Sequence, residues 1–232
     1  MMPAFQRRVA VISSMREIFA AAGFALALLM PLQAEAQVSY EPSLVSRLPE
    51  YCKYTQLFRD NVPGGNNPAE IERLTRLMGN TFIHMHHYCF GLMNVNRAAF
   101  LSNTRGDRLH NLNYSLLEFD YVIDRAPADF SLLPEILTRR GESLILLDRS
   151  AEAMLEFQRA IKIKADYTLP YAAMSDYYKG TGQLPKAREW LEKGLAAAPN
   201  ARPLMRRMAE LDRLKGKRET GSARKPAAPP PQ

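Results

Sequence analysis

Apolar residues in the second half of the chain recur at the spacings of amphipathic helices. Leu137 and Leu144 are seven positions apart, so they stand on one face of a helix. Ala153, Phe157 and Ala160 follow at spacings of four and three, which places them on one face of a second helix. Small residues let two such helices approach closely, while Phe157 fills the groove between them. The pattern therefore predicts a helix–turn–helix unit.

The same pattern returns after a fixed interval of 34 residues. The matched pairs are Gly141 and Ser175, Leu144 and Tyr178, Ala153 and Ala187, Phe157 and Leu191, Ala160 and Gly194, and Ala165 and Pro199. In the second unit Gly182 closes the turn and Pro199 stops the second helix. A fixed period of this length is typical of proteins built from repeated helix pairs. The two clear units cover residues 134–200.

Less regular segments flank these two units. Upstream, second-helix spacings recur at Ser115, Phe119, Val122 and Pro127. They predict a third, irregular unit, whose first helix carries Gly91 in the small-residue position, with residues 101–111 as an inserted loop. Downstream, residues 203–214 are expected to form a solvating end helix, because arginines interrupt their apolar stripe. Stacks of this kind bury a continuous core only with about three or more units.

The pattern resembles the tetratricopeptide repeat family. The corresponding positions are Leu137, Arg140, Gly141, Leu144, Ala153, Phe157, Ala160 and Ala165, and then Tyr171, Met174, Ser175, Tyr178, Ala187, Leu191, Gly194 and Pro199. Departures from the family pattern are Arg140 and Ala165 in the first unit and Ser175 and Leu191 in the second. The resemblance implies an all-α fold. Antiparallel helix pairs would stack into a short right-handed superhelix, preceded by an irregular helical N-terminal part.

The resemblance also implies a binding surface. In that family the position after the small residue of the first helix lines a concave groove, and here that position holds Glu142 and Asp176. The groove residues so implied are Thr138, Glu142, Ala172, Asp176 and Lys179. A protein or peptide partner would lie there as a helix or extended segment. The groove lacks the lysine-and-asparagine set with which some members clamp a C-terminal carboxylate. A solvated face is the alternative interpretation of the charges.

The N-terminus has the pattern of an export signal. Three arginines precede an apolar run over 19–32, which ends in a small-x-small site, so a signal peptide is expected over 1–36 with cleavage after Ala36. The mature protein would be periplasmic or secreted. A membrane span needs about 20 apolar residues, so no integral span is expected after cleavage. An uncleaved anchor and a start at Met15 are alternatives.

The residues that follow the signal predict a less regular helical region. A short helix is expected around 48–59. Asn67 is a good N-cap, with Pro68 at the first helical position and Glu70 at the third, so a helix should start there and run to about Met78. The expected divisions are the signal 1–36, a leader with a short helix 37–66, N-terminal helices 67–130, repeats with a capping helix 131–216, and a tail 217–232.

The segment HMHHYC, residues 84–89, gathers three of the four histidines and one of the two cysteines. His84, His86, His87 and Cys89 are candidate ligands, and such soft ligands would suit copper. Successive helical residues turn by about 100°, however, so these side chains point in different directions. The sequence has no CxxC, CxxCH or HExxH motif. A periplasmic metal-binding protein is therefore the second functional hypothesis, after a partner-binding scaffold.

A structural interpretation of the same segment is favoured. In an oxidising compartment Cys89 has one partner, Cys52, and a disulfide between them would close a loop of about 37 residues. His87 would take the large-residue position that faces the partner helix. His84 and His86 would remain as functional surface.

Catalysis has little support in the sequence. No GxSxG motif, glycine-rich phosphate loop or carboxylate pair with catalytic spacing occurs, so no enzyme activity and no cofactor are expected. An enzyme would require that His87 or Cys89 be exposed and activated.

The net charge of +7 is concentrated at the C-terminal end, where residues 213–232 carry six basic residues and one acid. The signal adds one more positive charge, which leaves the body near neutral. A nucleic-acid-binding surface is therefore not expected. The tail 217–232 is rich in Ala, Pro and basic residues and is expected to be disordered. It would be a solubilising end, or it would make weak contact with an anionic surface.

Overall fold

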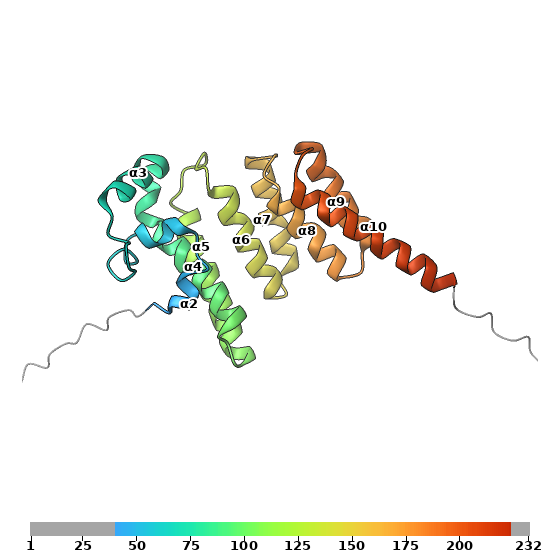
Figure 1. Cartoon of the computed structure of the whole chain (residues 1–232), viewed down its shortest axis with the longest axis horizontal. Coiled ribbons are helices and arrows are strands. Elements are labelled where there is room, and N and C mark those ends of the chain that lie inside the picture. Colours follow the sequence, from blue (N-terminus) through green and yellow to red (C-terminus); the bar gives the residue numbers. More distant parts are fainter. Residues whose placement is uncertain (1–39, 224–232) are drawn as a thin grey trace, which may run out of the picture. The chain divides into compact units, whose positions relative to one another are not determined.

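The computed structural model describes residues 40–223, with side chains described from 40 to 216. Every regular element of that part is helical and none is a strand, which confirms the all-α class (Figure 1). The elements are α2 (Pro42–Val45), η2 (Glu50–Tyr54), α3 (Pro68–Met78), η3 (Gly79–His84), α4 (Met85–Phe100), α5 (Arg105–Ile123), α6 (Leu133–Leu146), α7 (Ser150–Ile163), α8 (Leu169–Gly180), α9 (Leu184–Ala197) and α10 (Arg202–Ala223). Both the expected signal peptide and residues 224–232 of the tail lie outside the described residues. In the described part, no helix combines the length and the apolar character needed to cross a bilayer.

Helix α3 begins as its sequence predicts. The Asn67 side-chain oxygen accepts hydrogen bonds from the backbone N–H groups of Ala69 and Glu70, at 3.1 and 3.3 Å. Pro68 occupies the first turn, where its missing N–H costs nothing. The helix then ends at Met78, as expected.

The short helix expected over 48–59 is mostly absent. Only the 3₁₀ helix η2 forms there, and it stops before Thr55, whose backbone is extended. The Thr55 hydroxyl donates to the carbonyl oxygen of Cys52 at 2.7 Å. A side chain that bonds the local backbone in this way competes with helical hydrogen bonding, which explains the early end.

Helices α4 to α10 pack as successive neighbours in two rows. Helix α4 packs on α5, α6 on α7, and α8 on α9, with α10 following as an unpaired last helix. One row runs α4, α6, α8 and α10, and each of its members also contacts the next. Within the described residues, the other row, α5, α7 and α9, has no comparable contacts between its members. We call the first of these the contacting row.

The first helix pair is larger than the sequence suggests. Residues 101–111 were expected to form an inserted loop, but α4 continues to Phe100 and α5 begins at Arg105. The reason is an N-cap that the prediction missed. The Thr104 hydroxyl accepts a hydrogen bond from the backbone N–H of Asp107 at 3.0 Å and donates to its carboxylate at 2.7 Å. This reciprocal cap stabilises the first turn of α5.

The core follows the repeated pattern. Leu137, Leu144 and Phe157 have no exposed side-chain area, and Phe119 of the first pair is equally buried. The turns also repeat, because Asp148 and Gly182, 34 residues apart, both adopt positive φ, at 62° and 78°. The expected glycine turn of α8–α9 is thus confirmed, and an aspartate makes the same turn between α6 and α7.

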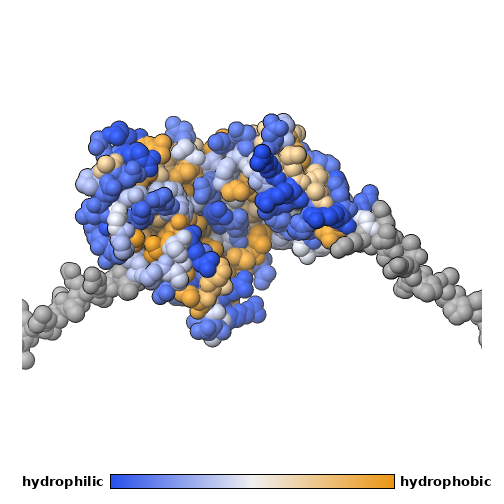
Figure 2. All heavy atoms as spheres, viewed as in Figure 1, coloured by the Kyte–Doolittle hydropathy of each residue, from blue (hydrophilic) through white to orange (hydrophobic). Residues whose placement is uncertain are grey.

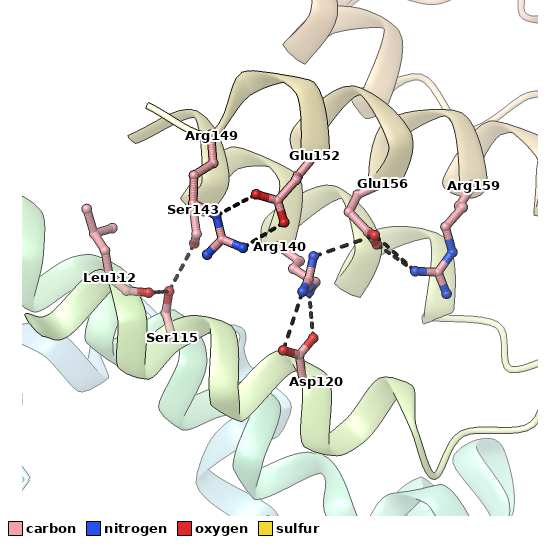
Figure 3. Close-up of polar contacts among 9 residues, drawn as sticks. All are labelled: Leu112, Ser115, Asp120, Arg140, Ser143, Arg149, Glu152, Glu156 and Arg159. Atoms are coloured by element: carbon pink, nitrogen blue, oxygen red, sulfur yellow. Dashed lines mark hydrogen bonds and ion pairs between the residues drawn. The ribbon is translucent and has the colours of Figure 1, made fainter. Parts of the chain in front are cut away.

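Arg140, one of the departures from the repeat pattern, joins three helices (Figure 3). Its Nε donates to Asp120 of α5 at 2.5 Å, and its Nη1 lies 3.5 Å from Glu156 of α7. Glu156 is buried and also accepts from Arg159 at 3.0 Å. The charged side chain therefore replaces apolar packing with a polar link between successive helix pairs.

The last helix extends further than predicted. Leu204 and Leu211 of α10 are buried against α8 and α9, as the apolar stripe indicates. The helix continues to Ala223, whereas residues from 217 onwards were expected to be disordered. No proline occurs between Pro203 and Pro226, so nothing in this stretch forces the helix to stop.

Candidate functional site: two pockets along the contacting row

A pocket of about 420 Å³ lies between α4, α6 and the leader. We call it the α4–α6 pocket. Its apolar wall consists of Leu92 and Val95 of α4, and its charged wall consists of Glu135, Arg139 and Glu142 of α6. Residues Arg47, Leu48 and Pro49 of the leader, with Asn96 of α4, complete the lining. A surface that combines apolar area with a few placed polar groups is typical of ligand-binding pockets.

Arg139 is incompletely paired at this pocket. Its Nη1 donates to Glu142 at 2.9 Å, but its Nε is buried and has no hydrogen-bond partner in the described part of the chain. The hydroxyl groups of Tyr51 and Tyr167 are likewise buried and unpartnered. Burial raises the pKa of both phenols, with a further contribution from nearby Glu135, so both hydroxyls keep their protons at neutral pH. Such groups are rare in folded proteins, because each costs free energy.

The repeat register explains the missing acceptor. Arg207 of α10 occupies the position two periods after Arg139, and its Nε and Nη2 donate to Asp176 at 2.9 and 2.8 Å. Asp176 comes one residue after the small-residue position of the preceding first helix. At that same position α4 has Leu92, after Gly91, and leucine accepts no hydrogen bond. The α4–α6 pocket therefore has the arginine of the pattern without its carboxylate.

A second pocket, of about 450 Å³, lies between α8 and α10, and we call it the α8–α10 pocket. Asp176 and Lys179 of α8 face α10 there, where Lys179 donates to Glu210 at 3.0 Å. Arg206 and Arg213 of α10 also line the pocket. Cross-helix ion pairs thus join α8 to α10, and arginine is in excess.

The structure divides the five expected groove residues. Glu142 lines the α4–α6 pocket, and Asp176 and Lys179 line the α8–α10 pocket. Thr138 and Ala172 are buried, so their assignment as groove contacts was wrong. The Thr138 hydroxyl donates to the carbonyl oxygen of Pro134 at 2.7 Å, because its own helix satisfies it.

Sequence reasoning missed Arg139, Arg207 and Glu210 as pocket residues. The first two are two periods apart, and Glu210 stands one period after Asp176. Extending the 34-residue comparison into α10 would have found all three, because the end helix occupies the position of a further first helix.

His87 of the HMHHYC segment packs as expected against α5. Its ring stacks on Tyr121 with ring centroids 3.6 Å apart, and its Nδ1 lies 2.6 Å from a carboxylate oxygen of Glu118. On the other side of Tyr121, the Arg125 guanidinium lies 3.6 Å from the ring centroid. His84 meets the edge of the same tyrosine. These contacts join α4 to α5 and account for the segment structurally.

His86 is a core residue, so the expectation that it would form functional surface was wrong. Its Nδ1 donates to the carbonyl oxygen of Ile83 at 2.9 Å, and the residue is 9% exposed. Burial lowers the pKa of His86 to about 4, with a smaller contribution from His87. In the described residues, no group of three or more His, Cys, Asp or Glu side chains is arranged to hold a metal ion.

The Sγ atoms of Cys52 and Cys89 are 2.09 Å apart, the length of a disulfide, and the Cα atoms are 5.7 Å apart. The bond joins η2 to α4 within a cluster of buried apolar residues that includes Leu44, Phe58 and Met93. It therefore fastens the leader that lines the α4–α6 pocket. Cys89 is buried as well as bonded, which is the opposite of the exposed thiol that catalysis would require.

The sequence matches no protein-family model and none of the curated proteins with which it was compared.

Proposed function

We propose that the protein is an exported, non-catalytic scaffold of the tetratricopeptide-repeat type. The contacting row α4, α6, α8 and α10 forms the inner surface of a short right-handed superhelix, and a peptide or protein partner binds along it. Two observations support the curvature: members of this row contact one another, and members of the other row make no comparable contacts in the described part of the chain. Neighbouring helices are closest on the inner side of a bend.

The observation that carries the proposal is the incomplete pairing in the α4–α6 pocket. Arg139 has a buried Nε without a partner in the described part of the chain, and it lines the same pocket as Leu92 and Val95. An oxygen atom of a bound peptide, reached by a rotation of the guanidinium group, would supply the acceptor that Asp176 supplies to Arg207. The apolar wall would take a neighbouring side chain of the same peptide.

Affinity capture with a matched pair of variants tests this assignment. Asn96→Arg places a long charged side chain in the pocket, whereas Asn113→Arg makes the same change at an exposed position of α5. Both variants should keep the helical content and melting temperature of the parent protein. Envelope proteins captured by the parent chain and by Asn113→Arg, but lost with Asn96→Arg, would support the pocket. Identical capture by all three chains would reject it.

Export has its own test. The mature protein isolated from the cell envelope should begin at Gln37, as read by intact-mass measurement. An intact N-terminus on cytoplasmic protein would reject the periplasmic location and leave the binding surface to be judged separately.

A further inference from the structure

Two arginines of α10 line the α8–α10 pocket without forming an ion pair among the described residues. Arg206 and Arg213 are exposed at the α8–α10 pocket, and no ion pair to either occurs within the described part of the chain. Arg213 donates only to the backbone oxygen of Ala209 in its own helix, at 3.3 Å. The two acids of the pocket are already used, because Asp176 pairs with Arg207 and Glu210 pairs with Lys179. The pocket therefore has an excess of two positive charges.

The other acid of α10 whose side chain is described is also paired. Asp212 forms an ion pair with Arg188 of α9, on the side of α10 away from the pocket lining. Figure 2 shows strongly hydrophilic residues along α10 on the face in view. Within the described side chains, therefore, no acid pairs with Arg206 or Arg213, and both guanidinium groups are open to a ligand.

The spacing of the two arginines favours one geometry of ligand. They are seven residues apart, so they lie on the same side of α10, separated by about 10 Å along the axis at about 1.5 Å per residue. A peptide extended in the polyproline II conformation advances about 3.1 Å per residue with three residues per turn, so its side chains three residues apart lie on one face, about 9 Å from each other. Acidic side chains at every third position of such a segment would meet both guanidinium groups.

We propose that the α8–α10 pocket binds an acidic, extended segment of a partner protein through Arg206 and Arg213. This inference rests on the proposed scaffold function and specifies the chemistry of its partner. The arginines line a recess between two helices, which a narrow peptide enters more readily than a flat bilayer. Guanidinium–carboxylate pairs, bidentate where geometry allows, supply the recognition.

Fluorescence anisotropy with a defined probe tests the proposal. The probe is a fluorescein-labelled peptide of four Gly-Ser-Glu repeats, and the same peptide with lysine in place of glutamate is the negative control. The intact mature protein should bind the acidic probe, and binding should weaken as salt is raised. The double variant Arg206→Glu/Arg213→Glu should bind at least about tenfold more weakly, because repulsion replaces two charge pairs.

A matched variant controls for net charge. Arg105→Glu/Arg108→Glu makes the same charge change at exposed positions of α5, and it should bind the acidic probe as the parent protein does. Equal losses in the two double variants, or no binding by the parent protein, would overturn the proposal. So would binding of phosphatidylglycerol vesicles that depends on Arg206 and Arg213 without binding of the peptide, because the site would then belong to a membrane.

The outcome can be separated from that of the scaffold function. Loss of captured partners with Asn96→Arg, together with no binding of the acidic probe, would reject only the acidic ligand. Probe binding that depends on Arg206 and Arg213, without any partner that depends on Asn96, would retain the acidic site and reject the α4–α6 pocket.

Discussion

Gly91 of α4 lies directly against the ring of Phe119 in α5, and a Cβ atom on that glycine would overlap the ring. Gly141 of α6 stands in the same relation to Phe157 of α7, where a Cβ would lie 2.5 Å from Cε1. The two helix pairs therefore use one packing device, although the first pair is longer. This equivalence justifies treating α4–α5 as the irregular first unit of the repeat.

Substitution of Gly141 by alanine should destabilise the protein by about 1–3 kcal/mol, because an added methyl group overpacks a closed contact. The ring of Phe157 is fully buried and cannot move aside without disturbing its neighbours. Urea titration followed by circular dichroism would measure the change in unfolding free energy.

The control for this substitution is Gly180→Ala, at the end of α8. A Cβ there meets no atom within 4 Å. Alanine should be neutral or stabilising by up to about 1 kcal/mol, because it has the higher helix propensity. A loss at Gly180 as large as the loss at Gly141 would contradict the packing argument.

The sequence predicts the helix pairs well, because their cores depend on local spacing. The small residue of one helix and the aromatic residue of the next recur at positions that a 34-residue comparison finds directly. The caps are equally local, as Asn67 shows. Thr104 was missed although it has the same chemistry, since the spacing between α4 and α5 departs from the period.

The pocket residues were predicted less well, because their roles depend on contacts between helices far apart in sequence. The family resemblance assigned Thr138 of α6 to the groove, but the residue is buried. Asp176 lines the α8–α10 pocket, but its pairing with Arg207 of α10 follows only from the packed structure. The unpaired Nε of Arg139 could not be foreseen, since it results from Leu92 in an irregular unit.

The disulfide should contribute about 3–4 kcal/mol, because it closes a loop of 37 residues in the unfolded chain. The variant Cys52→Ala/Cys89→Ala should therefore unfold at a much lower urea concentration than the oxidised parent protein. Dithiothreitol should lower the stability of the parent protein and leave that of the double variant unchanged. Equal urea midpoints for the oxidised parent and the variant would show that the bond adds no stability.

Arg140→Leu should destabilise the protein by about 1.5–3 kcal/mol. The substitution restores an apolar residue at a position that is apolar in the repeat pattern, but it removes the contacts to Asp120 and Glu156. The Arg140 side chain is only 17% exposed, and hydrogen bonds to charged groups in such settings are stronger than exposed ones. Thermal and urea unfolding would measure the loss.

Arg149→Leu provides the comparison for Arg140→Leu (Figure 3). Arg149 pairs with Glu152, and the two side chains are 41% and 50% exposed. Solvent screens such a pair, so the substitution should change the unfolding free energy by less than about 1 kcal/mol. Equal losses for the two variants would show that the link between helix pairs adds nothing beyond a surface ion pair.

Acidification should destabilise the fold through His86. Its pKa is about 4 in the folded protein and 6.5 in the unfolded reference, because burial disfavours the charged ring. The folded chain thus binds fewer protons than the unfolded chain between these two values. The stabilisation from His86 is fully present above pH 6.5 and is lost progressively as the pH falls towards 4. His84 and His87 lie nearby and oppose protonation further.

The variant His86→Asn isolates this effect. An asparagine amide can still donate to the carbonyl oxygen of Ile83, but it does not titrate. Urea titrations at pH 7, 6 and 5 should show a shallower fall in unfolding free energy for the variant than for the parent protein. Carboxylate titration remains common to both chains, so it cancels in the difference between their profiles. Parallel profiles would show that His86 takes up its proton equally in the folded and unfolded states, contrary to the burial of its ring.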